Sequence, residues 1–199
     1  MMKMVDRIMD RPFDVLLDEL RDGDTELDPA SLYFLSSLDT EEAEQVRNLW
    51  PDLPSSLRLE LIQQLVRMAE ADFTLNYGAV FRIALEDESA EVREVAVDGL
   101  WEDQDVRLVP RLAERLEADE CVTVRAAAAR SLGNFILLGE LEKIRPKPHQ
   151  EAYEALLRAY RAGHETPEVQ LRALASLAYV CNETVVAAIR EAYVSEEER

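Results

Sequence analysis

Few side chains in this 199-residue chain have the types and spacing that nucleophilic or metal chemistry needs. The two histidines, His149 and His164, are too few for a histidine-based zinc or iron site, or for a serine–histidine nucleophile. Cys121 and Cys181 have no disulfide or metal spacing, and their acidic surroundings are expected to raise the pKa of both thiols and keep them inert. There is no glycine-rich phosphate loop. We therefore expect no catalytic, cofactor-binding or metal-ligating residue, and a function other than catalysis.

The charge balance points instead to a protein partner. The chain has 41 acidic against 22 basic side chains, a net charge of −19. Such a surface repels nucleic acid and anionic membranes and favours a protein with a basic segment. Solubility alone is the alternative explanation of the charge. No run approaches the about 18 apolar residues of a membrane span, and charges interrupt the starting "MMKMVDRIMD", so we expect no membrane insertion, no signal peptide and a cytoplasmic protein.

The stretch "DGLWEDQD", from Asp98 to Asp105, combines an aromatic side chain with acids. One interpretation makes Trp101 an aromatic anchor with an acidic rim that binds a basic peptide. The other packs Trp101 between neighbouring helices while the acids cover a turn, and for Trp50 packing is the stronger interpretation. The candidate partner-binding residues are Glu60, Glu94, Asp98, Trp101, Glu102 and Asp103.

The elements that position these residues are helices. Apolar residues recur at helical spacing almost throughout, and nothing alternates with period two over a useful length. Asp28-Pro29 and Leu53-Pro54 mark helix starts, and Thr40 precedes a helix with acids in its first turn. The sequence therefore predicts an all-α fold.

Four segments repeat the same buried stripe, and each follows another amphipathic helix, so the unit is helix A, short turn, helix B. Prolines in "GELEKIRPKPH" predict an irregular loop before the fourth unit. We divide the chain into an N-terminal helical cap, residues 1–38, and a repeat array, residues 39–199. Its trailing A-like helix has no B partner, so either the acidic tail caps it or the array is longer. The matching stripe positions are Leu57, Val92, Val124 and Val169, then Leu61, Ala96, Ala128 and Ala173, then Leu65, Leu100, Leu132 and Leu177.

An aspartate stands six residues before an arginine at three of the A-to-B turns. The pairs are Asp52 and Arg58, Asp87 and Arg93, and Asp119 and Arg125. The aspartate can accept hydrogen bonds from the start of helix B, and the arginine fork can reach carboxylates and carbonyls next door. The fourth unit has His164 and Gln170 at the matching places, so we expect the contact between the third and fourth repeats to be the loosest.

This pattern resembles HEAT repeats, in particular the short bacterial type named after phycobilisome bilin lyases, over about Asp39 to Val194. The resemblance implies a right-handed α–α superhelix, a HEAT-like solenoid of about four two-helix repeats plus N-terminal helices. It also implies that the Asp–Arg pairs form a structural ladder that joins neighbouring repeats. Iron-binding HEAT-type hydroxylases use several His-Glu pairs, and the single pair His164-Glu165 cannot build that site.

The function that follows is a bacterial scaffold or adaptor that binds a protein through an acidic concave helical surface. Two alternatives stay open. One is a lyase-like pigment-attachment factor, which the resemblance alone suggests. The other is a self-assembling structural protein that associates through its C-terminal helix.

Overall fold

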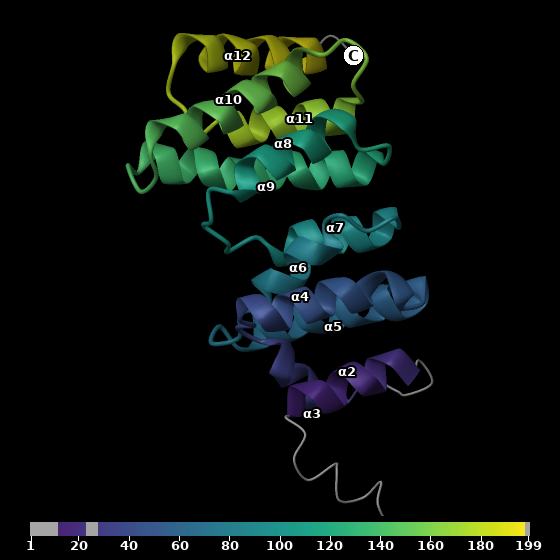
Figure 1. Cartoon of the computed structure of the whole chain (residues 1–199). Helices are drawn as coiled ribbons and strands as arrows, with labels where there is room; N and C mark the ends of the chain where they lie inside the picture. Colours follow the sequence, from purple (N-terminus) through teal and green to yellow (C-terminus); the bar gives the residue numbers. More distant parts are fainter. Residues whose placement is uncertain (1–11, 23–27, 198–199) are drawn as a thin grey trace, which may run out of the picture. The chain divides into compact units, whose positions relative to one another are not determined.

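The computed structural model describes residues 12–22 and 28–197, with side chains through residue 192. The starting segment "MMKMVDRIMD" and the acidic end of the chain lie outside the residues whose side chains are described. Within the described residues every regular element is a helix, so the all-α prediction is confirmed (Figure 1). The chain divides into two compact units, Met1–Leu100 and Trp101–Arg199. The boundary that we placed at residue 38 stays a prediction.

The first unit contains two A-to-B pairs preceded by short helices. Helix α4 (Thr40–Leu49) is followed by η2 (Trp50–Asp52) and α5 (Ser55–Ala71), and α6 (Gly78–Ala84) by α7 (Ala90–Gly99). The B helices α5 and α7 pack against each other, and the A helices α4 and α6 do the same. Before them come α2 (Pro12–Asp22), α3 (Pro29–Leu32) and η1 (Tyr33–Leu35).

Helix starts in this unit follow from capping side chains. Asp28 accepts a hydrogen bond from Ala30 N–H, and Pro29 takes the first helical position, as the sequence predicts. Helix α4 begins at Thr40, one residue earlier than expected, and its N-cap residue is Asp39, which accepts from Glu42 N–H at 2.9 Å while Glu42 accepts from Asp39 N–H at 3.1 Å. This capping box satisfies donors that a bare helix end would leave unpaired.

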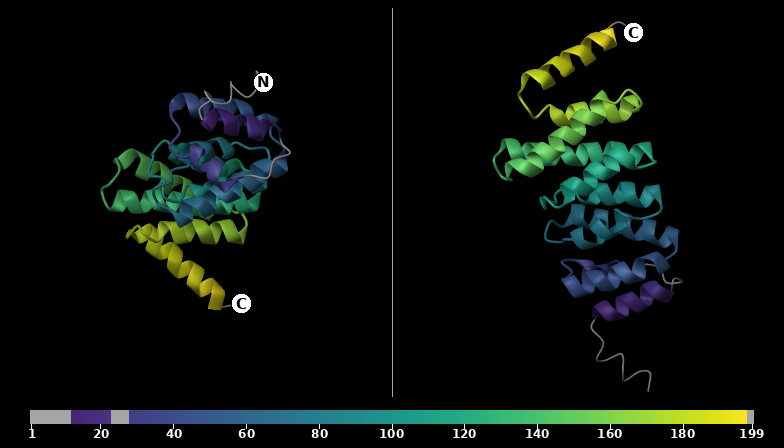
Figure 2. Two further views of the ribbon diagram at one scale, coloured as in Figure 1. Left: turned by 90° about the horizontal axis from the view of Figure 1, so that it is seen from below. Right: turned by 45° about the horizontal axis from the view of Figure 1, so that its top comes forward.

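The second unit repeats the arrangement with longer helices. Its A helices are α8 (Leu108–Ala118) and α10 (Pro146–Arg161), and its B helices are α9 (Val122–Glu140) and α11 (Pro167–Leu177). In Figure 1, α8 and α10 lie in front of α9 and α11, and each A helix packs on its own B helix. Helix α12 (Glu183–Glu197) follows α11 and lies at an angle to it (Figure 2).

The buried stripe predicted from the repeats forms the core of both units. All its positions are buried except Leu57, which is half-buried. Small stripe residues matter as much as large ones, because alanines at the α9–α11 contact let the two helices approach closely. At that contact Ser176 donates a hydrogen bond to the Ala129 carbonyl at 2.9 Å.

The irregular loop predicted before the fourth unit is shorter than expected, and its prolines lie in a helix. The extra residues lengthen the helices instead: α9 runs to Glu140 and α10 begins at Pro146, leaving only residues 141–145 between them. The prolines fit because Pro146 and Pro148 lie in the first turn of α10, where a helix has no partner for backbone N–H groups. No helix among the described residues is both long and apolar enough to cross a membrane.

Candidate functional site

Asp87, in the turn between α6 and α7, is the centre of a buried polar network in the first unit. Its Oδ2 accepts a hydrogen bond from Trp50 Nε1 at 2.6 Å and lies 3.0 Å from Nε of Arg58, on the preceding B helix. Arg58 also donates to Glu88 at 2.7 Å. The Asp87 side chain is fully buried and that of Arg58 is 5% exposed, so this is an ion pair in the protein interior. It joins the turn of one repeat to helix B of the repeat before it.

Asp87 also forms a hydrogen bond within its own turn. Its Oδ1 accepts from the N–H of Ser89, the N-cap residue of α7, at 2.8 Å. Arg93 returns from α7 and donates to the carbonyls of Asp87 and Glu88 at 2.8 and 3.0 Å. The carboxylate therefore accepts from the start of helix B, while the arginine satisfies turn carbonyls that have no helical partner.

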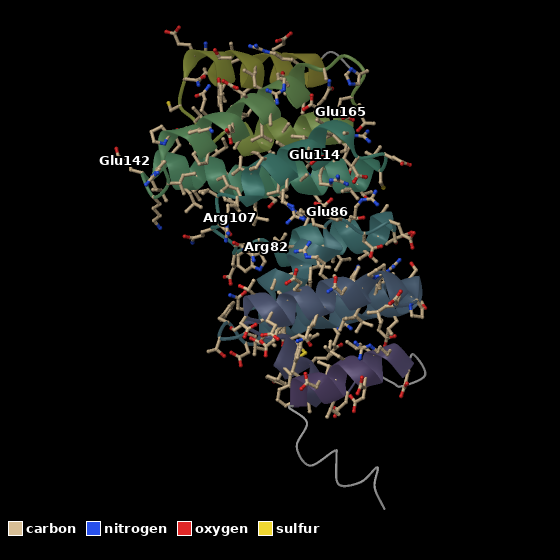
Figure 3. The ribbon with its side chains drawn as sticks, viewed as in Figure 1. Arg82, Glu86, Arg107, Glu114, Glu142 and Glu165 are labelled. Atoms are coloured by element: carbon tan, nitrogen blue, oxygen red, sulfur yellow. The ribbon has the colours of Figure 1, made fainter. Side chains whose placement is uncertain are left out.

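Arg125 occupies the corresponding place in the second unit. It donates to the Asp119 and Glu120 carbonyls of its own turn at 2.7 and 3.2 Å. Its Nε and Nη2 also form a two-pronged pair with the Glu165 carboxylate of the next turn, both at 2.9 Å. Figure 3 labels Glu165 in that turn, between α10 and α11. The bidentate geometry is the strong form of such a pair.

The pKa values in this pair reflect the contact. Burial alone would raise the pKa of Glu165, but hydrogen bonds from Arg125 and from Thr166 N–H outweigh it and hold the pKa below its usual value. The hydrogen bond to Glu165 likewise raises the pKa of Arg125. Both groups are therefore charged in the folded protein at neutral pH.

The fourth A-to-B turn also contains a carboxylate that accepts a hydrogen bond from the start of helix B, but it lies one residue after the aligned position His164. Glu165, next to His164, accepts from the N–H of Thr166, the N-cap residue of α11, at 2.7 Å. It thus does what Asp87 does in the second turn. Gln170 also takes over part of the arginine role, because it donates to the turn carbonyl of Ala162 at 2.9 Å.

This arrangement changes which contact between neighbouring repeats is expected to be the loosest. The sequence argument placed it between the third and fourth repeats because Gln170 replaces an arginine. The arginines reach forward to the next turn, however, and Arg125 bonds to Glu165 between these two repeats. The link that Gln170 fails to make is therefore the next one, towards α12.

The other two ladder aspartates differ from each other. Asp119 is buried, and its Oδ1 accepts from the N–H of Cys121, the N-cap residue of α9, at 3.0 Å. Asp52 is exposed at the end of η2. The first turn therefore carries an arginine, Arg58, whose ion pairs are made with the next turn and not with the aspartate six residues before it.

The candidate partner-binding residues of the first unit lie on its two B helices. Glu60 is exposed on α5. Glu94 and Asp98 are half-buried on α7, and a separation of four residues places them on one face of that helix. Helices α5 and α7 pack side by side, so these acids belong to neighbouring helices of one layer.

The remaining candidates lie in the second unit. The Trp101 side chain is 53% exposed, which favours the anchor interpretation over packing, whereas Trp50 is buried as expected. Glu102 is exposed, and Asp103 is half-buried and accepts from Asp105 N–H. Asn134 of α9 donates to the Trp101 carbonyl at 2.7 Å and fixes this loop against the B helix.

Acidic charge is concentrated in the first half of the chain. Residues 1–100 contain 23 acidic and 9 basic side chains, a net charge of −14, and residues 101–199 contain 18 and 13, a net charge of −5. The B helices follow the same trend, since Ala126 and Arg130 of α9 stand in the repeat register where Glu94 and Asp98 stand on α7. A basic partner is attracted most strongly to the first unit.

The described residues contain no group of three or more His, Cys, Asp or Glu side chains placed to hold a metal ion. The expectation for Cys121 is wrong in sign, because hydrogen bonds with the side chain and backbone of Thr123 lower the pKa of its thiol despite the nearby Asp119. Sequence reasoning also missed Glu88, Glu165 and the bond from Trp50. The signal for Glu165 was its place directly after the aligned position His164.

Comparison with known families gives one match. Residues 79–162 match the family model for HEAT repeats, a range that runs from α6 to the end of α10. Comparison with curated proteins gives no match.

Proposed function

We propose that this chain, whose residues 79–162 match HEAT repeats, is a non-catalytic scaffold or adaptor that holds a partner protein through an acidic surface on its B helices. HEAT repeats generally serve as protein-interaction scaffolds, and the family is typically non-enzymatic. The observation that carries the proposal is the acidic first unit, in which Glu60, Glu94 and Asp98 lie on two adjacent B helices.

The partner that fits this surface is a protein with a basic segment. Complementary charge speeds encounter and sets the register, while apolar anchors supply most of the affinity. Trp101, with Glu102 beside it, offers such an anchor in the second unit. The few, scattered cysteines and the short repeat type favour the cytoplasm of a bacterium as the place where the protein works.

The test is capture of partners from a lysate of the native host, with identification by mass spectrometry. The variant combines Glu60→Lys with Glu94→Gln and Asp98→Asn, and it should lose the partner that the unaltered chain retains. The control Glu41→Lys with Glu44→Lys makes the same total change of charge on α4 and should retain it. If both variants lose the partner equally, or neither does, the acidic B-helix surface is not the binding site.

A second candidate function is self-association through the outer face of α11. Leu171 on this helix is 62% exposed, and Tyr179, two residues after the helix ends, is 53% exposed. In the repeat register Leu171 matches Ala126 of α9, which is buried. Light scattering over a concentration series tests this candidate: a mass that rises with concentration and falls back in Leu171→Glu supports it, and a strict monomer removes it.

A further inference from the structure

A groove runs between the two A helices of the second unit, on the opposite layer from the B helices. Two adjoining hollows lie along it, both bordered by Arg158, and the more enclosed has a volume of about 230 Å³. That volume is below the about 300–1,000 Å³ of small-molecule sites, so it suits a side chain of a larger partner. Figure 3 labels Glu114, which borders the groove on α8, and Glu165, which borders its far end.

The groove exists because its floor is made of small side chains. Ala113 from α8 faces Ala155 and Ala159 from α10, and Leu116 closes the bottom. Ala155 and Leu116 are buried, and the other two alanines are half-buried. Methyl groups at facing positions fill too little volume to close the space between two packed helices, so an apolar trough stays open to solvent.

The rim of the groove is acidic. Glu114 and Glu117 stand on the α8 side and Glu151 and Glu154 on the α10 side, whereas Arg158 is the one lysine or arginine among the residues that line the two hollows. The ion pairs along it are long and exposed: Arg158 lies 3.9 Å from Glu117, and Lys147 lies 3.7 Å from Glu151. Exposed pairs at such distances contribute little to stability, so these glutamates can pair with basic side chains of a partner instead.

The two helices that form the walls also determine which backbone conformation a bound peptide segment can adopt. Both walls are α-helices whose N–H and C=O groups bond within the helix, so they offer no edge to an extended peptide. An extended guest would bury unpaired backbone groups, whereas a helical guest satisfies its own. Small residues on the floor allow a third helix to approach closely.

We propose that this groove binds an amphipathic helix of a partner protein, with an apolar stripe against the alanine floor and Lys or Arg side chains against the four glutamates. This is the helix-in-groove mode of recognition. The surface is distinct from the acidic B-helix surface of the first unit, so an adaptor built this way holds two segments, one at each surface.

The probe is a fluorescein-labelled amphipathic peptide of Leu, Ala and Lys, about 15 residues long so that it can hold a helix. Its binding to the full chain is measured by fluorescence anisotropy. The rim variant is Glu114→Lys with Glu154→Lys. The matched control is Glu142→Lys with Glu183→Lys, which makes the same change of charge on exposed residues outside the groove. Ala159→Leu fills the floor without changing charge, and circular dichroism checks the fold of every variant.

The expected result is a loss of affinity of about tenfold or more in the rim variant and about twofold or less in the control, because close charge pairs contribute more than distant ones. Ala159→Leu should weaken the probe but not a Lys and Ala peptide without leucine. Equal losses in rim variant and control overturn the proposal and assign the binding to net charge. Equal binding of a proline-broken probe overturns the helical guest. A dimer that the rim variant dissociates, seen by light scattering, assigns the groove to a second copy of the chain and overturns it too.

Discussion

Arg58 and Arg125 show how one residue type joins neighbouring repeats. Each lies early in a B helix, and each reaches forward to a carboxylate of the next turn, Asp87 or Glu165. That carboxylate in turn accepts from the N–H of its own helix N-cap residue. We therefore propose that the fixed charges in these apolar helices stabilise the register of the repeats.

Removing Asp87 should be costly, because Trp50 and the N–H of Ser89 donate hydrogen bonds to its carboxylate and the buried Arg58 forms an ion pair with it. We expect Asp87→Ala to lower the free energy of unfolding by about 3–5 kcal/mol, since it leaves the buried Arg58 without a compensating charge. The matched control is Asp52→Ala at the exposed ladder position, which should change it by less than about 0.5 kcal/mol. Urea unfolding followed by circular dichroism measures both, and similar losses would contradict the forward-reaching ladder.

The Glu165 carboxylate makes a testable contribution to pH dependence. Its pKa in the folded chain is below the ordinary value of 4.5, so its stabilising effect is complete above pH 4.5 and disappears as the pH falls through the lower folded-state pKa. The difference in unfolding free energy between the unaltered chain and Glu165→Gln should therefore be largest near neutral pH and shrink below pH 4.5. Urea unfolding at a series of pH values tests this, and a difference that stays constant would rule it out.

At the scale of elements, the contact between α9 and α11 depends on a glycine. A Cβ at Gly133 would stand 2.8 Å from Ser176 Oγ and 3.0 Å from its Cβ. Alanine is the better helix former, but here it would push the helices apart and disturb the bond from Ser176 to the Ala129 carbonyl.

We therefore expect Gly133→Ala to destabilise the chain by about 1–3 kcal/mol, the range of overpacked cores. Gly163→Ala is the control, because nothing lies within 4 Å of a Cβ there. It should change stability by less than about 0.5 kcal/mol. Thermal unfolding compares the two, and a stable Gly133→Ala protein would mean that α11 can move away at little cost.

Helix α12 should be the least protected helix of the second unit. Gln170 is neutral and cannot form the ion pair with the next element that Arg58 and Arg125 form. Two hydrogen bonds join α12 and the residue before it to α10: Tyr160 donates to the Ala188 carbonyl, and Asn182 donates to the Tyr153 hydroxyl, both at 3.2 Å. Hydrogen exchange followed by mass spectrometry should therefore be faster in α12 than in α9 and α11. Protection in α12 equal to that in α11 would show that the missing arginine has no consequence.

At the scale of the whole molecule, the net charge of −19 acts against compactness. Added salt screens the repulsion between exposed carboxylates, while the buried pair of Arg58 and Asp87 is screened much less. We expect the Tm to rise by about 2–4 °C between low and moderate salt, which corresponds to about 1 kcal/mol for a chain of this size. A Tm that falls with salt would mean that attractive surface pairs dominate.

The sequence by itself determined the helices, their pairing into A and B, and the buried stripe, because each follows from the local period of apolar residues and from caps such as Asp28-Pro29. It also located the arginines at the turns. It could not determine their partners. Whether Arg58 reaches backwards to Asp52 or forwards to Asp87 depends on the position of the next repeat, which a sequence period does not contain.

Tertiary structure alone decided the features that depend on spaces between helices. Trp101 came out exposed and Trp50 buried, although both stand near acids in the sequence. The apolar groove arises because alanines from α8 and α10, more than thirty residues apart in the chain, meet face to face. No single helix reveals this space, because it is the pairing of two small side chains across a contact between helices that leaves room for a guest.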